Sequence, residues 1–79
     1  MNKTKQTEQK EIGRVKLGDT QDLVVSIVDD EKVDLRIFLN TGSYKGPTKR
    51  GARFYMFDDN WTEFKKLIEK VDKVYEEIV

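Results

Sequence analysis

The sequence predicts one α+β domain, a four-stranded antiparallel sheet followed by one C-terminal amphipathic helix. Three observations predict it. The chain has 79 residues, which is room for a single domain. Short runs of β-branched residues recur between turn residues in its first two thirds, and its last twenty residues repeat apolar side chains at helical spacing.

Residues 1–10 have Met1 as their sole apolar residue and are rich in Lys, Gln and Thr. Such a segment buries too little apolar surface to offset the entropy lost on ordering. It is therefore expected to be a disordered polar tail, and the domain is expected over residues 11–79. The first strand is expected from Glu11 to Leu17.

The next two strands are expected to form a hairpin. Residues 23–28 (LVVSIV) are too short for a helix, and residues 33–39 (VDLRIFL) alternate after four charged residues. Successive side chains of a strand point to opposite faces, so residues 33, 35, 37 and 39 share the face predicted to be core. Asp34, Arg36 and Phe38 share the other face, which is predicted to be available for binding.

Residues 40–51 hold three glycines, Pro47 and several Ser, Thr and Asn residues, a composition typical of turns. They are predicted to form a long loop. A fourth strand is expected over residues 52–57, with Ala52, Phe54 and Met56 on one face and the intervening residues on the other.

The helix is expected to begin near residues 58–60, where Asn60 and Glu63 have the spacing of a capping box. Its apolar residues recur at steps of three and four and are expected to cover the sheet. They are Trp61, Phe64, Leu67, Ile68, Val71, Val74, Tyr75 and Ile78.

So small a core needs support, and disulfides and zinc are excluded because the sequence has no Cys and no His. A homodimer is the support that remains.

The absence of His and Cys also removes the commonest general base and the thiol nucleophile. Carboxylates at residues 29–31 and 58–59 fit turn and helix-start chemistry, so we expect a binding protein with no cofactor or metal, not an enzyme.

The formal net charge is zero, 38% of the residues are charged and the mean hydropathy is −0.72. No apolar run reaches the roughly 20 residues of a membrane span, so an intracellular protein with no membrane contact is expected. The charges are unevenly distributed. Every charged residue between Asp34 and Asp58 is basic, namely Arg36, Lys45, Lys49, Arg50 and Arg53.

These cations lie around Tyr44 and Tyr55 in the sequence. Basic groups mixed with aromatic rings on a sheet are what single-stranded nucleic acid requires, because charge follows the phosphates and rings stack on bases. A solvated loop kept soluble by Lys and Arg explains the same pattern. The residues alone leave both interpretations open.

The order of the segments VDLRIFL, GPTKRGARF and NWTEFKKLIEKVDKVYEEI resembles the core domain of the transcriptional positive cofactor four family. That family comprises coactivators that bind single-stranded DNA and has bacterial relatives. The resemblance covers about residues 11–79. It implies four antiparallel strands with a helix, dimerisation partly through the helices, and a grooved surface for unpaired DNA strands.

Carried over one residue at a time, the resemblance assigns DNA contacts to the strand arginine Arg36, the aromatic residue Phe38 beside it, and the basic pair of the turn, Lys49 and Arg50. Arg14 and Lys16 lie in the first strand, which aligns loosely. Tyr44, Lys45 and Arg53 join the candidates because they lie in the same cationic segment.

The chain departs from the family pattern in three places. Leu39 stands where the family has a base-stacking tryptophan, and Asp29 and Asp30 stand where its hairpin turn carries lysines. The segment from Gly51 to Trp61 is about two residues longer. The leading hypothesis is a single-stranded DNA-binding protein acting in transcription or its regulation; the alternatives are a protein-interaction module of the same fold and an RNA-binding protein.

Overall fold

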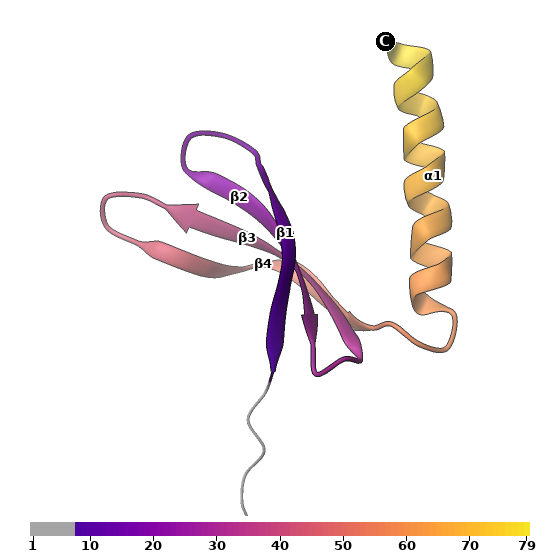
Figure 1. Cartoon of the computed structure of the whole chain (residues 1–79). Coiled ribbons are helices and arrows are strands. Elements are labelled where there is room, and N and C mark those ends of the chain that lie inside the picture. Colours follow the sequence, from indigo (N-terminus) through magenta and orange to yellow (C-terminus); the bar gives the residue numbers. More distant parts are fainter. Residues whose placement is uncertain (1–7) are drawn as a thin grey trace, which may run out of the picture.

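The computed structural model describes residues 8–79 and shows a four-stranded antiparallel sheet followed by one C-terminal helix (Figure 1). The strands pair in sequence order, β1-β2-β3-β4, so β1 and β4 are the edges. The elements are β1 (Gln9–Lys16), β2 (Gln21–Val28), β3 (Lys32–Asn40), β4 (Lys45–Tyr55) and α1 (Asn60–Ile78). No helix in this part of the chain is long and apolar enough to cross a membrane.

The β2–β3 hairpin has the faces that alternation predicts. Val25 pairs with Leu35 and Val24 pairs with Arg36, so the side chains of β3 alternate between a charged and an apolar face, whereas β2 carries apolar side chains on both. We call the face of Asp34, Arg36 and Phe38 the polar face, and the face of Leu35 the apolar face. The predicted hairpin is confirmed, and period-two alternation in β3 sets which of its side chains share a face.

Strand β1 begins at Gln9, two residues inside the expected tail. Gln9 pairs with Val28, and the backbone N–H of Asp29 donates to the carbonyl oxygen of Glu8 at 2.7 Å. The expected boundary is wrong because ladder hydrogen bonds come from the backbone and do not require apolar side chains. Residues 1–7, the rest of the expected tail, lie outside the described residues.

The predicted long loop over residues 40–51 is largely strand. A four-residue turn at 41–44 closes a hairpin in which Asn40 pairs with Lys45 and Phe38 pairs with Pro47. The turn is fixed by the Thr41 hydroxyl, which accepts from the backbone N–H of Tyr44 at 2.9 Å. Pro47 is tolerated because an edge strand can leave one backbone position without a donor.

An irregularity in β4 explains the turn-like composition that suggested a loop. Arg36 pairs with Gly51 and Phe38 pairs with Pro47, so two steps along β3 correspond to four along β4. Three residues of β4, Thr48–Arg50, therefore lie opposite the single residue Ile37, and we call these three the bulge. Gly51 closes it with φ +149°, a conformation that favours glycine, and approaches the backbone of Leu35 too closely for any side chain.

The buried core is very small. Among the described residues, the apolar side chains that are fully buried are Val24, Val28 and Val33. Val24 and Val28 lie on the polar face, together with the buried Ser26, whereas the apolar face is mostly half-buried. The face predicted to be the core is therefore covered incompletely within one chain.

Helix α1 does not cover the sheet, contrary to the expectation from its apolar stripe. None of its residues is buried, and it extends away from the strands beyond its first turns (Figure 1). Its aromatic contact with the sheet is made by Phe64, whose ring centroid lies 5.5 Å from that of Phe54. The connection contains Asp58 and Asp59 with φ +57° and +71°, and this left-handed turn directs the helix outward.

The predicted capping box at the start of α1 is also absent. Asp59 is the N-cap residue and makes no side-chain capping hydrogen bond. The Asn60 side-chain amide instead donates to the carbonyl oxygen of Tyr55 at 2.7 Å. Asn60 is therefore used to join the helix start to the end of β4.

The close approach at Gly51 yields a stability prediction. A Cβ there would lie 2.1 Å from the Leu35 carbonyl oxygen, so Gly51→Ala must displace β4 from β3. We expect a loss of about 2 kcal/mol or more in the free energy of unfolding, measured by urea denaturation.

Gly18→Ala is the matched control, because an added Cβ at Gly18 meets nothing within 4 Å. It should change the stability by less than about 0.5 kcal/mol. Equal effects of the two substitutions would contradict the bulge geometry.

Candidate nucleic-acid interface

The register gathers cations from three strands on the polar face. Arg14 of β1 and Arg36 of β3 both pair with Val24, so they lie in line across the sheet. In the same way Lys16 and Phe38 both pair with Asp22, and residues of β4 pair with β3 on the same face. The cations brought together in this way are Arg14, Lys16, Lys32, Arg36, Lys45 and Arg53. Most of the predicted site residues therefore share one face.

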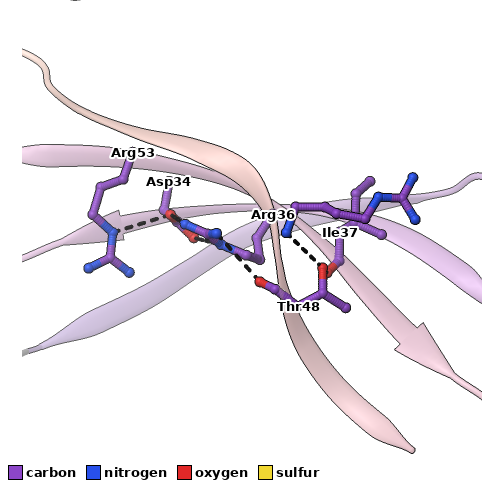
Figure 2. A network of polar contacts seen from close by, with 6 residues as sticks. Asp34, Arg36, Ile37, Thr48 and Arg53 are labelled. Atoms are coloured by element: carbon purple, nitrogen blue, oxygen red, sulfur yellow. Dashed lines mark hydrogen bonds and ion pairs between the residues drawn. The ribbon is translucent and has the colours of Figure 1, made fainter.

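The centre of this face is organised by a buried carboxylate (Figure 2). The side chain of Asp34 is 2% exposed and accepts from Arg36 and, at 3.2 Å, from Nε of Arg53. Burial acts to raise the pKa of Asp34, but the hydrogen bonds from Arg36 and Arg53 outweigh it and hold the pKa below its ordinary value. Asp34 is therefore charged at neutral pH.

Arg36 also holds the bulge in place (Figure 2). Its Nη1 donates to the carbonyl oxygen of Thr48 at 3.4 Å, and the Thr48 hydroxyl donates to the carbonyl oxygen of Ile37 at 2.8 Å. The same hydroxyl accepts from the backbone N–H of Arg50 at 3.1 Å. With its side chain only 18% exposed and its charge compensated by Asp34, Arg36 positions the bulge and offers little to a ligand.

Arg14 is compensated twice. A bulge in β1 puts Glu11 on the same face, and Arg14 donates to both Glu11 carboxylate oxygens at 2.9 and 2.8 Å and to Asp22 at 3.1 Å. Its guanidinium carbon lies 5.2 Å from the ring centroid of Phe38. The charge of Arg14 is therefore compensated. What Arg14 offers a ligand is the flat, half-exposed plane of a guanidinium that lies over an aromatic ring.

Four of the predicted cations make no ion pair within residues 8–79. Lys16 and Lys45 lie at one end of the polar face, and Lys49 and Arg50 lie in the bulge. Since nothing in the described chain compensates them, these four are the groups best placed to meet phosphates.

A depression of about 340 Å³ lies where the polar face ends at the β3–β4 turn. Its lining includes Arg14, Asp22, Phe38, Asn40 and Lys45. Tyr44 lies next to it and donates its hydroxyl proton to the carbonyl oxygen of Pro47. An aromatic ring, a flat guanidinium and polar groups at one depression suit a planar ligand with a phosphate.

The acidic β2–β3 turn lies at the opposite end of the sheet. Seven positions separate Glu31 from Phe38, which at about 3.3 Å per residue is roughly 23 Å along β3. That separation exceeds the Debye length of about 8 Å in physiological salt, so Asp29 and Asp30 repel phosphate weakly at the depression. Tyr55 pairs with Lys32 at the acidic end and is therefore separated from the depression.

Sequence reasoning missed two residues of this surface. Asp22 lines the depression and Thr48 fixes the bulge, but both functions depend on cross-strand register, which the sequence does not state. Within the described chain, no group of three metal-ligating side chains lies close enough to hold an ion.

No protein-family model, curated protein or solved structure matches this chain.

The Asp34 cluster yields a prediction of pH dependence. A carboxyl with a lowered folded-state pKa stabilises the fold above its unfolded pKa of about 4, and this contribution is lost as the pH falls through the folded value. Asp34→Asn should therefore cost about 2 kcal/mol at pH 7 and progressively less below pH 4. Urea denaturation at pH 7 and below pH 4 measures the free energy of unfolding of both proteins.

Asp30→Asn serves as the control, because Asp30 is exposed in a turn where Asn also tolerates its positive φ. Its stability should follow the unmodified protein at every pH. A pH-independent cost for Asp34→Asn would show that the carboxylate charge is not what stabilises the cluster.

Proposed function

We propose that this chain binds single-stranded DNA on the basic end of its polar face and in the bulge, as a homodimer acting in transcription or its regulation. The observation that carries the proposal is a set of four uncompensated cations near an aromatic ring. Lys45 lines the depression that contains Phe38, Lys16 pairs with Asp22 of its lining, and Lys49 and Arg50 lie in the bulge that follows Pro47. The resemblance of the strand, turn and helix segments to the cofactor four family supports the role in transcription.

The binding chemistry follows from the two kinds of group on this surface. Lys and Arg attract phosphates without reading sequence, Tyr44 offers a ring on which a base stacks, and the Arg14 guanidinium over the Phe38 ring offers a second plane. Tyr44 is almost half exposed in the β3–β4 turn. A duplex already stacks its bases internally, so a surface of this kind favours an unpaired strand.

The homodimer is supported by the apolar surface that a single chain leaves uncovered. Beyond Trp61 and Phe64, the apolar stripe of α1 is at least 50% exposed at each position, namely Leu67, Ile68, Val71, Val74, Tyr75 and Ile78. Helices in proteins depend on packing of such a face for most of their stability. A second copy burying the stripe in a two-fold interface supplies this packing and enlarges a core of three valines.

The same stripe favours a second candidate function, a protein-interaction module whose helix binds an apolar groove of another protein. RNA remains a third candidate, because stacking and phosphate contacts do not distinguish the sugars. The oligomeric state distinguishes the protein-interaction module from the DNA-binding homodimer. Competition between matched DNA and RNA oligonucleotides distinguishes DNA binding from RNA binding.

The four cations yield a prediction of salt dependence. Fluorescence anisotropy with a labelled single-stranded DNA should give a log affinity that falls with log salt at a slope of roughly −3, about 0.7 for each phosphate contact. Removing two contacts in Lys49→Ala/Arg50→Ala should weaken binding and reduce the slope to roughly −1.5. The matching duplex should bind more weakly throughout.

Lys65→Ala/Lys73→Ala removes the same charge from exposed positions on α1 and should leave both affinity and slope nearly unchanged. If both double variants lose affinity equally, binding depends on overall charge and the proposed interface is wrong. A flat salt response would rule out phosphate contacts.

The homodimer predicts a solution mass of about twice the 9.3 kDa chain in light scattering. Val71→Glu places a charge in the centre of the exposed stripe and should give a monomer, because an unpaired charge opposes burial. Thr62→Glu adds the same charge at an exposed position near the helix start and should remain a dimer. A monomeric unmodified protein would instead favour the protein-interaction module.

A further inference from the structure

One side chain in the depression does not suit phosphate binding. Asp22 is a carboxylate among Arg14, Lys45 and the uncompensated Lys16, and it would repel the backbone of a nucleic acid. We propose that the depression is a subsite for one unstacked nucleotide and that Asp22 makes it selective for guanine. This inference rests on the proposed function and deepens it.

The stacking surface is the guanidinium of Arg14, which lies over the ring of Phe38. The guanidinium of Arg14 is held by Glu11 and Asp22, and its carbon lies 5.2 Å from the Phe38 ring centroid. Bases stack on arginine planes as well as on aromatic rings. A guanidinium fixed in this way loses little conformational entropy when a base stacks at the site.

The edge of the base would meet Asp22. One Asp22 oxygen, Oδ2, accepts from Arg14, and within residues 8–79 the other oxygen has no hydrogen-bond partner. A carboxylate only accepts, and it accepts best from a pair of donors. Guanine presents two adjacent N–H donors on its Watson–Crick edge, whereas thymine presents one donor between two carbonyl oxygens that the carboxylate would repel.

The remaining groups fit a single nucleotide. Lys45 lines the same depression and can pair with its phosphate, and the Asn40 amide can donate to a carbonyl oxygen of the base. A volume of about 340 Å³ lies at the lower end of the range for small-ligand sites, roughly 300–1,000 Å³. Neighbouring nucleotides would lie over Lys16 or the bulge and make contacts independent of sequence.

A simpler role for Asp22 is to orient Arg14 without contacting the base. A substitution of Glu11 distinguishes this role from recognition of the base. Glu11 holds Arg14 through two hydrogen bonds but does not line the depression. If Asp22 only orients Arg14, then Asp22→Asn and Glu11→Gln should have the same effect on every oligonucleotide. If Asp22 reads the base, only Asp22→Asn changes the base preference.

The test uses thymine oligonucleotides of one length whose central base is guanine, hypoxanthine, adenine or thymine, measured by fluorescence anisotropy. The unmodified chain should bind the guanine oligonucleotide about fivefold or more tightly than the thymine one, with hypoxanthine weakened because it lacks the exocyclic donor. Asp22→Asn should abolish this preference while retaining binding to thymine. Glu11→Gln should keep the preference.

Equal binding of all four oligonucleotides by the unmodified chain overturns the subsite and leaves the proposed function standing. A uniform loss in Asp22→Asn that Glu11→Gln reproduces also overturns it, because Asp22 would then only position Arg14. Failure of every oligonucleotide to bind overturns the proposed function and this inference together. Thermal unfolding of both variants verifies that they are folded.

Discussion

The interaction on which the sheet depends is the pairing of the buried Asp34 carboxylate with two guanidinium groups. A charge removed from water is tolerated only when it is paired, and Asp34 meets Arg53 across the β3–β4 ladder. A slip of one residue would move Arg53 to the apolar face and leave Arg36 as the one guanidinium on the carboxylate. The pair therefore specifies the register of the last strand, which hydrophobic alternation alone specifies weakly in a segment rich in glycine.

Carboxylates on the polar face divide its cations into two groups with different functions. Arg14, Arg36 and Arg53 are compensated by carboxylates and shape the surface, whereas the cations of the bulge are not. Arg36 links the groups, because it joins Asp34 to the carbonyl oxygen of Thr48 and so holds the bulge that contains Lys49. The division determines which of these cations is free to pair with a phosphate. A count of Lys and Arg along the sequence does not reveal it.

The sequence predicted the sheet, the faces of the β2–β3 hairpin and the helix, because alternation and helical spacing are local properties. It failed at residues 40–51, where glycine and proline indicated a loop but backbone pairing with β3 extends β4 through them. The stripe of α1 showed which face must be buried but not against what, so coverage of the sheet was wrongly expected. Asp22 was missed because it meets Phe38 only through the register.

The separation of charge along the sheet bears on how tightly one chain can hold a strand. Its acidic turn lies about 23 Å from the depression, so the proposed nucleic-acid site is confined to the basic end and the bulge. A few phosphate contacts and one or two stacked bases give modest affinity for each protomer. In the proposed dimer, a strand bound to one protomer reaches the second site at high effective concentration, so avidity supplies what each site lacks. Burial of the α1 stripe and retention of DNA would then be linked, because loss of the interface separates the two sites without changing either one.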